Sequence, residues 1–178
     1  MSELSINDPF YNFYNFCTKT CDAMKLLQKE GFVIQGLVVL YSAIDTMAWA
    51  NLPSGDVTRS AFKEWIDHYM LCKYPLPCTS EELYAARCGL VHSHTAESKM
   101  SREQNVREIY YYGKGTSKEL LESKVGGRSD VIQVRLLDLQ MSFFAGIDAF
   151  FELLDSDPSR AEQVRNRTRL WMSWFDSH

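Results

Sequence analysis

Four polar side chains in two apolar segments have the types and spacing needed to bind an anion and transfer a proton. Arg87, His92 and His94 lie close together in the segment YAARCGLVHSH, and Asp45 lies in an earlier apolar segment. A guanidinium binds carboxylate or phosphate oxygens through paired hydrogen bonds. An imidazole has an ordinary pKa of about 6.5, so it exchanges protons near neutral pH. These residue types predict a site for an anionic group.

Arg87 is expected to point toward the core of the protein. It lies between Leu83 and Leu90 on one helical stripe, and an inward-facing arginine needs a carboxylate partner or an anionic ligand. Asp45 is the expected partner, because a carboxylate on an apolar helix must be paired, hydrogen-bonded or protonated. A catalytic support role and a purely structural ion pair both remain open. Asp148, in a later apolar segment, raises the same question.

The segment from Arg87 to His92 resembles the Arg-x(4–6)-His motif of the HEPN superfamily. The small and apolar residues around it resemble the helix that carries this motif, and Asp45 lies on the helix where such domains often carry an acidic residue. The resemblance covers about residues 8–95 and the helix that begins at Leu136. It implies a HEPN-like up-and-down helical bundle that forms a homodimer.

The motif departs from the family pattern in two ways. The residue after the motif arginine is often Asn, Asp or His, whereas here it is Cys88, which is a weaker hydrogen-bonding group. Two histidines also lie at permitted spacings. The family spacing favours His92, whereas on a straight helix His94 lies nearly in line with Arg87 and His92 lies about 140° away. His92 is preferred and His94 remains the alternative.

The resemblance implies a metal-independent endoribonuclease with no cofactor and no metal. His92 would move the proton of an attacking 2′-hydroxyl, Arg87 would stabilise the charge that develops on the phosphate, and Asp45 would orient Arg87. Many members of the superfamily act in toxin–antitoxin and other defence systems, so RNA and a cognate antitoxin are the implied partners. The alternative is a non-catalytic HEPN-like module that binds RNA, a nucleotide or a partner protein, which Cys88 favours.

Hydrophobic periodicity predicts an all-α fold. The pattern predicts helices over residues 8–30, 32–51, 80 to 92 or 94, 136–154 and 159–175. A further helix is predicted to run to about Cys72, capped by Asp56 or Thr58. Thr79 and Glu82 have the spacing of a capping box, which would begin the fourth helix. The arginines of the last helix are expected to form a solvated face.

A small β-ribbon is expected to interrupt this helical order. Residues 106–112 and 130–134 are rich in β-prone side chains and are flanked by glycines, which predicts two antiparallel strands with a helical turn over 117–123 between them. Residues 1–178 are expected to form a single HEPN-like helical domain, with the ribbon as an insertion at about 106–134.

The composition narrows the function classes. The 178 residues include 46% hydrophobic side chains, enough for a substantial core, and the net charge of −4 argues against a general polyanion binder. The five cysteines form no CxxC pair, and no histidine lies at a matching spacing, so zinc is not expected. Gln35, Asp45 and Asp148 break the longest apolar segments, so we expect no membrane span and a cytoplasmic location.

Overall fold

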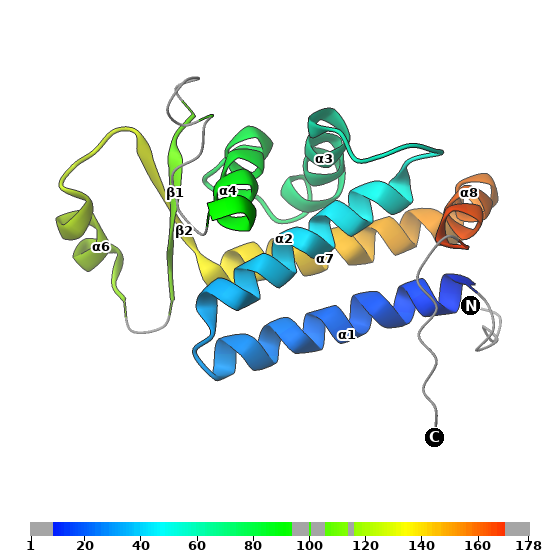
Figure 1. Ribbon diagram of the computed structural model, residues 1–178, viewed down its shortest axis with the longest axis horizontal. Coiled ribbons are helices and arrows are strands. Elements are labelled where there is room, and N and C mark those ends of the chain that lie inside the picture. Colours follow the sequence, from blue (N-terminus) through cyan, green and yellow to red (C-terminus); the bar gives the residue numbers. More distant parts are fainter. Residues whose placement is uncertain (1–8, 94–99, 101–105, 114–115, 170–178) are drawn as a thin grey trace.

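Three long helices form the frame of the fold (Figure 1). The computed structural model describes residues 9–93, 100, 106–113 and 116–169. The long helices are α1 (Pro9–Lys29), α2 (Val33–Asn51) and α7 (Leu136–Ser156). The chain turns from α1 into α2 at Gly31, whose φ of 81° is readily reached only by glycine. Nine residues of α2 are buried, so this helix lies at the centre of the fold.

Shorter helices cover one side of α2 and the end of the frame. They are α3 (Arg59–Trp65), the π-helix η1 (Ile66–Leu71), α4 (Ser80–Ser93) and α8 (Pro158–Thr168). Thr58 caps α3 by accepting a hydrogen bond from the backbone N–H of Ala61 at 3.2 Å. The prediction of one regular helix through Cys72 is wrong, because the chain changes to π-helical hydrogen bonding after Trp65.

The predicted capping box at the start of α4 is confirmed. The backbone N–H of Thr79 donates to Glu82 Oε2 at 2.8 Å, and the backbone N–H of Glu82 donates to Thr79 Oγ1 at 3.2 Å. Arg107 Nε also donates to Glu82 Oε1 at 2.5 Å. Glu82 therefore fixes the first turn of α4 and ties it to the chain segment that leads into the ribbon.

Replacing Glu82 with glutamine is expected to lower the free energy of unfolding by about 1–3 kcal/mol, because a buried, charge-assisted acceptor is lost. Burial opposes ionisation, but the bonds from Arg107 and Thr79 hold the pKa of Glu82 below its ordinary 4.5. A depressed pKa stabilises the fold above pH 4.5, and this contribution disappears as the pH falls through the folded-state value. Urea denaturation at pH 7 and at pH 3 measures the loss, which should shrink at the lower pH.

The ribbon is a parallel pair of strands, so the prediction of antiparallel strands is wrong. β1 (Glu108–Tyr112) pairs with β2 (Val131–Arg135), and Glu108 lies opposite Val131. Between the strands lies α6 (Lys118–Val125), which forms part of the connection. Parallel strands require a crossover long enough to return to the starting edge, whereas antiparallel strands need only a short turn. The helical turn predicted between the strands is this crossover.

α2 is long and apolar enough to cross a membrane when judged by length and composition alone. Half of its most apolar window is buried inside the fold, as in the central helix of a soluble protein. This property is weak evidence for a membrane span.

Candidate functional site

Arg87 and Asp45 meet between α4 and α2, as predicted from the sequence. Nε and Nη2 of Arg87 both lie 2.9 Å from Oδ2 of Asp45. Each side chain keeps 24% of its surface exposed. The pair is therefore sheltered enough to be held in place, and it still reaches solvent. Arginine carries more N–H donors than this one carboxylate oxygen accepts, and Cys88 is a further hydrogen-bonding partner of the guanidinium.

Burial and the attraction between Asp45 and Arg87 have opposite effects on the pKa values of the two groups. Burial raises the pKa of the Asp45 carboxyl above its ordinary value, although the hydrogen bond and the charge of Arg87 oppose the rise. Burial alone would lower the pKa of Arg87, but Asp45 and Cys88 together raise it. Arg87 is therefore firmly charged, and keeping Asp45 ionised in this position costs the fold free energy.

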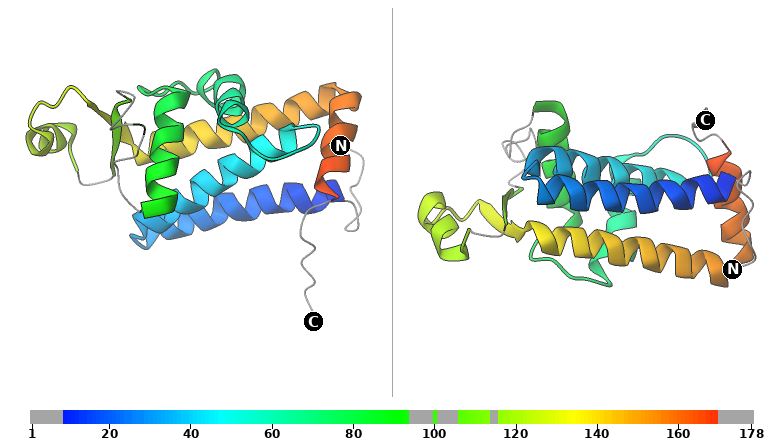
Figure 2. Two further views of the ribbon diagram at one scale, coloured as in Figure 1. Left: turned by 45° about the horizontal axis from the view of Figure 1, so that its top comes forward. Right: turned by 90° about the horizontal axis from the view of Figure 1, so that it is seen from below.

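The packing of α4 across α2 brings this pair together (Figure 2). On α4, Leu83 and Leu90 are buried on either side of Arg87 and fix the face that it presents. On α2, Tyr41 is fully buried one turn before Asp45. Its hydroxyl contacts the hydroxyl of Tyr111 on β1, so the ribbon packs against the same part of the bundle.

The first turn of α4 gathers further charged and aromatic side chains beside the pair. Glu81 accepts hydrogen bonds from Arg59 and Lys63 of α3, which locks α3 to α4. The ring of Tyr84 lies 5.4 Å from that of Phe62, and the guanidinium of Arg59 lies 5.8 Å from the Tyr84 ring. Sequence analysis missed this cluster. The spacing of Arg59 and Lys63 on one helix face is a signal that could have found it.

The structure describes the backbone of His92 but does not describe His94. His92 belongs to the last turn of α4, on the same helix as Arg87, and the position of its side chain is not described. His94 lies outside the described residues. The choice between His92 and His94 as the proton-transfer group therefore stays a prediction.

Asp148 does not share the environment of Asp45. It is exposed on α7 and faces α1, so the expectation of a second buried carboxylate is wrong. The reason is geometric: α7 is buried against η1 and α2, whereas its opposite face borders an open groove. Asp148 therefore belongs to a separate surface of the protein.

Within the part of the chain that the structure describes, no group of three or more His, Cys, Asp or Glu side chains is arranged to hold a metal ion. The described site consists of a fixed guanidinium and its carboxylate, with a histidine later on the same helix. No protein-family model, curated protein or solved structure matches this chain.

Proposed function

We propose that this protein is a metal-independent endoribonuclease of the HEPN type. The observation that carries the proposal is the guanidinium of Arg87, which Asp45 holds at 2.9 Å while a quarter of its surface remains exposed. His92 follows on the same helix. A group that contacts a phosphate must reach solvent, and Arg87 meets this requirement.

In the proposed reaction, the 2′-hydroxyl of the RNA attacks the adjacent phosphorus. The bond between 2′-oxygen and phosphorus forms, the bond from phosphorus to the 5′-oxygen breaks, and His92 or His94 transfers the proton. Arg87 donates hydrogen bonds to the charged oxygens of the transition state. Asp45 is a positioning residue, because it acts through Arg87. The products are a cyclic phosphate and a 5′-hydroxyl, and DNA is spared because it lacks the 2′-hydroxyl.

The proposal includes a homodimer in which two copies of α4 approach one another, as the HEPN resemblance implies. A dimer also relaxes the conflict between His92 and His94, because a histidine of one copy can serve the Arg87 of the other. Action in the cytoplasm as a toxin or defence component, restrained by a cognate antitoxin, is the corresponding biological role. No membrane association is part of this proposal.

A second candidate is a non-catalytic module that binds RNA, a nucleotide or a partner protein through the same site. Cys88 favours it, since this thiol replaces the more polar residue that often follows the motif arginine. The acidic net charge of −4 favours it as well. The two candidates differ in whether an RNA strand is cut.

The test is cleavage of labelled single-stranded RNA in the presence of EDTA by the purified full chain. Wild type is expected to cut RNA and leave 5′-hydroxyl ends, and to leave DNA of the same sequence intact. Replacing Arg87 with alanine is expected to lower kcat by about 100-fold or more, because a preorganised donor to the transition state is lost. His92→Ala is expected to be at least as damaging.

Arg128→Ala is the matched control, because Arg128 lies on the ribbon connection and is exposed. It should cut RNA as wild type does. If His94→Ala is inactive and His92→Ala is active, the assignment of the histidine changes and the enzyme class stands. If wild type does not cut RNA, or if all variants cut it equally, the proposal of a nuclease is contradicted. If wild type then still binds RNA and Arg87→Ala does not, the result supports the binding module.

A further inference from the structure

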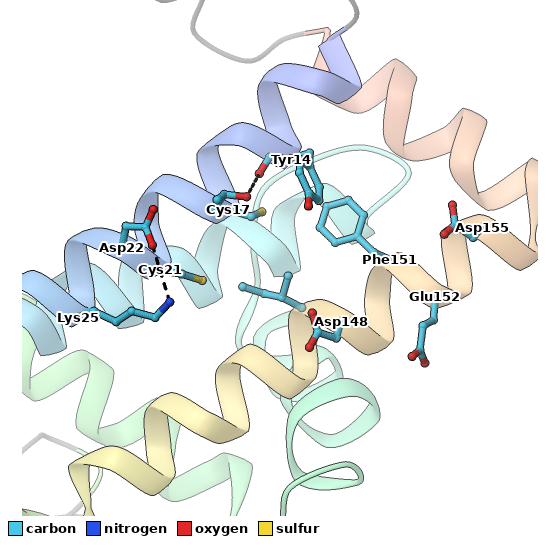
Figure 3. A pocket seen from close by; sticks show the side chains of 11 residues that line it. Tyr14, Cys17, Cys21, Asp22, Lys25, Asp148, Phe151, Glu152 and Asp155 are labelled. Carbon is cyan, nitrogen blue, oxygen red and sulfur yellow. Dashed lines mark hydrogen bonds and ion pairs between the residues drawn. The ribbon is translucent and has the colours of Figure 1, made fainter. Parts of the chain in front are cut away.

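A groove separates α1 from α7 on the side of the molecule away from α3 and η1 (Figure 3). The two helices enclose a cavity of about 450 Å³. Phe151 of α7 closes one end, where its ring lies 5.8 Å from Phe10 and 5.3 Å from Tyr14 of α1. Further along the groove, Cys21 and Lys25 project from α1 toward the α7 side.

Both walls of the groove carry side chains at the alternating spacing of four and three residues that helices use to pack on another helix. The α1 wall presents Tyr14, Thr18, Cys21 and Lys25. On α7, Asp148, Phe151 and Asp155 line the groove, and Leu137, Met141 and Phe144 continue the same spacing toward the N-terminus of the helix. Leu137 and Met141 are exposed, which is uncommon for two large apolar side chains on one stripe of a core helix. The two seams therefore face a space of the kind that a further helix would fill.

The charges along the groove define what kind of helix fits. Asp148, Glu152 and Asp155 all border the groove from α7, and none forms an ion pair with another described residue. Asp22 is neutralised by Lys25 at 3.7 Å, and the Lys25 ammonium also lies 5.5 Å from the centre of the Phe144 ring. The groove thus combines an apolar floor with an uncompensated negative rim.

We infer that the groove between α1 and α7 is a docking site for an amphipathic helix of a partner protein that carries apolar residues at three- and four-residue spacing, flanked by lysine or arginine. Apolar side chains of the partner would enter between Phe144 and Phe151, and its cations would meet Asp148, Glu152 and Asp155. In this mode of binding, an amphipathic helix lays its apolar face into a hydrophobic groove. The site is separate from Arg87 and Asp45, so the inference stands whether or not the protein cuts RNA.

Other occupants fit the charges poorly. In a second copy related by two-fold symmetry, the same acidic face would meet itself, and like charges would repel. The C-terminal segment 170–178 is rich in aromatic residues, but it contains Asp176 and no lysine or arginine. An anionic membrane surface would be repelled by the same carboxylates.

The probe is a synthetic peptide as long as α1, 21 residues, with leucine at the three- and four-residue spacing and lysine at the flanking positions. Its binding to the full chain is measured by isothermal titration calorimetry, beside a peptide in which glutamate replaces every lysine. The lysine peptide is expected to bind saturably with one-to-one stoichiometry. Asp148→Lys combined with Asp155→Lys should weaken it by at least about 10-fold and strengthen binding of the glutamate peptide.

Asp56→Lys combined with Glu64→Lys is the matched control. It makes the same change in net charge at exposed positions in and before α3, and it should leave the affinity within about 2-fold of wild type. Equal weakening by both double variants would show that net charge alone attracts the peptide and would overturn the inference. The inference is also wrong if the lysine peptide shows no saturable binding, or if a peptide of residues 170–178 binds the groove more tightly.

Discussion

Replacing Gly146 with valine is expected to lower the free energy of unfolding by about 3 kcal/mol, the upper part of the range for overpacking a core. A Cβ atom at this position would lie 2.8 Å from Cγ and 3.3 Å from Cα of Met70, and 3.2 Å from Cη2 of Trp65. α7 packs directly on η1 here, and both neighbours are fully buried. Because the contact includes backbone, η1 would have to move. Urea denaturation followed by circular dichroism measures the loss.

Two alanine variants separate packing from helix propensity. Gly36→Ala places a Cβ 3.7 Å from Leu27 Cβ, an ordinary contact, so the gain in helix propensity should raise stability by up to about 1 kcal/mol. Gly146→Ala has the same gain in propensity, but the close approach of Met70 should cancel or reverse it. If both alanine variants stabilise the protein equally, α7 does not approach η1 as closely as the structure indicates.

This close approach explains why the third helix could not be predicted in full. Its start follows from local chemistry, because Thr58 caps it and its apolar stripe is regular. The change to a π-helix after Trp65 lies where α7 meets the chain through Gly146. A π-helical turn is rare, and nothing in the local pattern of residues 66–71 distinguishes it from α-helix.

Long-range contacts also decide the other features that sequence analysis missed. Arg167, expected on a solvated face, is buried because it donates to the backbone carbonyl of Trp49 at 3.3 Å and its guanidinium lies 4.2 Å from the Trp49 ring. The parallel order of β1 and β2 depends on how far α6 carries the chain. Hydrophobic periodicity indicates which face of a helix or strand is buried. It does not indicate which distant element packs against that face.

The core of the candidate site was predictable for a simple reason. Asp45 and Arg87 are each the charged residue on an otherwise apolar helix stripe, and burial forces such groups to find one another. Asp148 on α7 is likewise a charged residue in an apolar segment, but in the structure its side chain is exposed. Asp148 is exposed because it lies on the face of α7 that borders the open groove beside α1.

Replacing Asp45 with asparagine is expected to lower the rate of RNA cleavage while leaving the stability of the fold nearly unchanged. The amide keeps an acceptor for Arg87 but removes the charge that holds the guanidinium in one orientation. RNA cleavage should fall by about 100-fold, mainly in kcat, because a displaced Arg87 no longer meets the transition state. The free energy of unfolding at pH 7 should change by no more than about 1 kcal/mol, since burial already opposes the ionised carboxylate.

The pH dependence of stability tests the same pair without using activity. The folded-state pKa of Asp45 lies above its ordinary 3.8, so the fold prefers the protonated carboxyl. Wild type should therefore lose stability relative to Asp45→Asn as the pH rises from 3.8 through that raised pKa, and the difference should become constant above it. If Asp45→Asn instead loses stability and cleavage in proportion at pH 7, the ion pair is structural. An unchanged rate of cleavage would remove Asp45 from the mechanism and leave Arg87 to act alone.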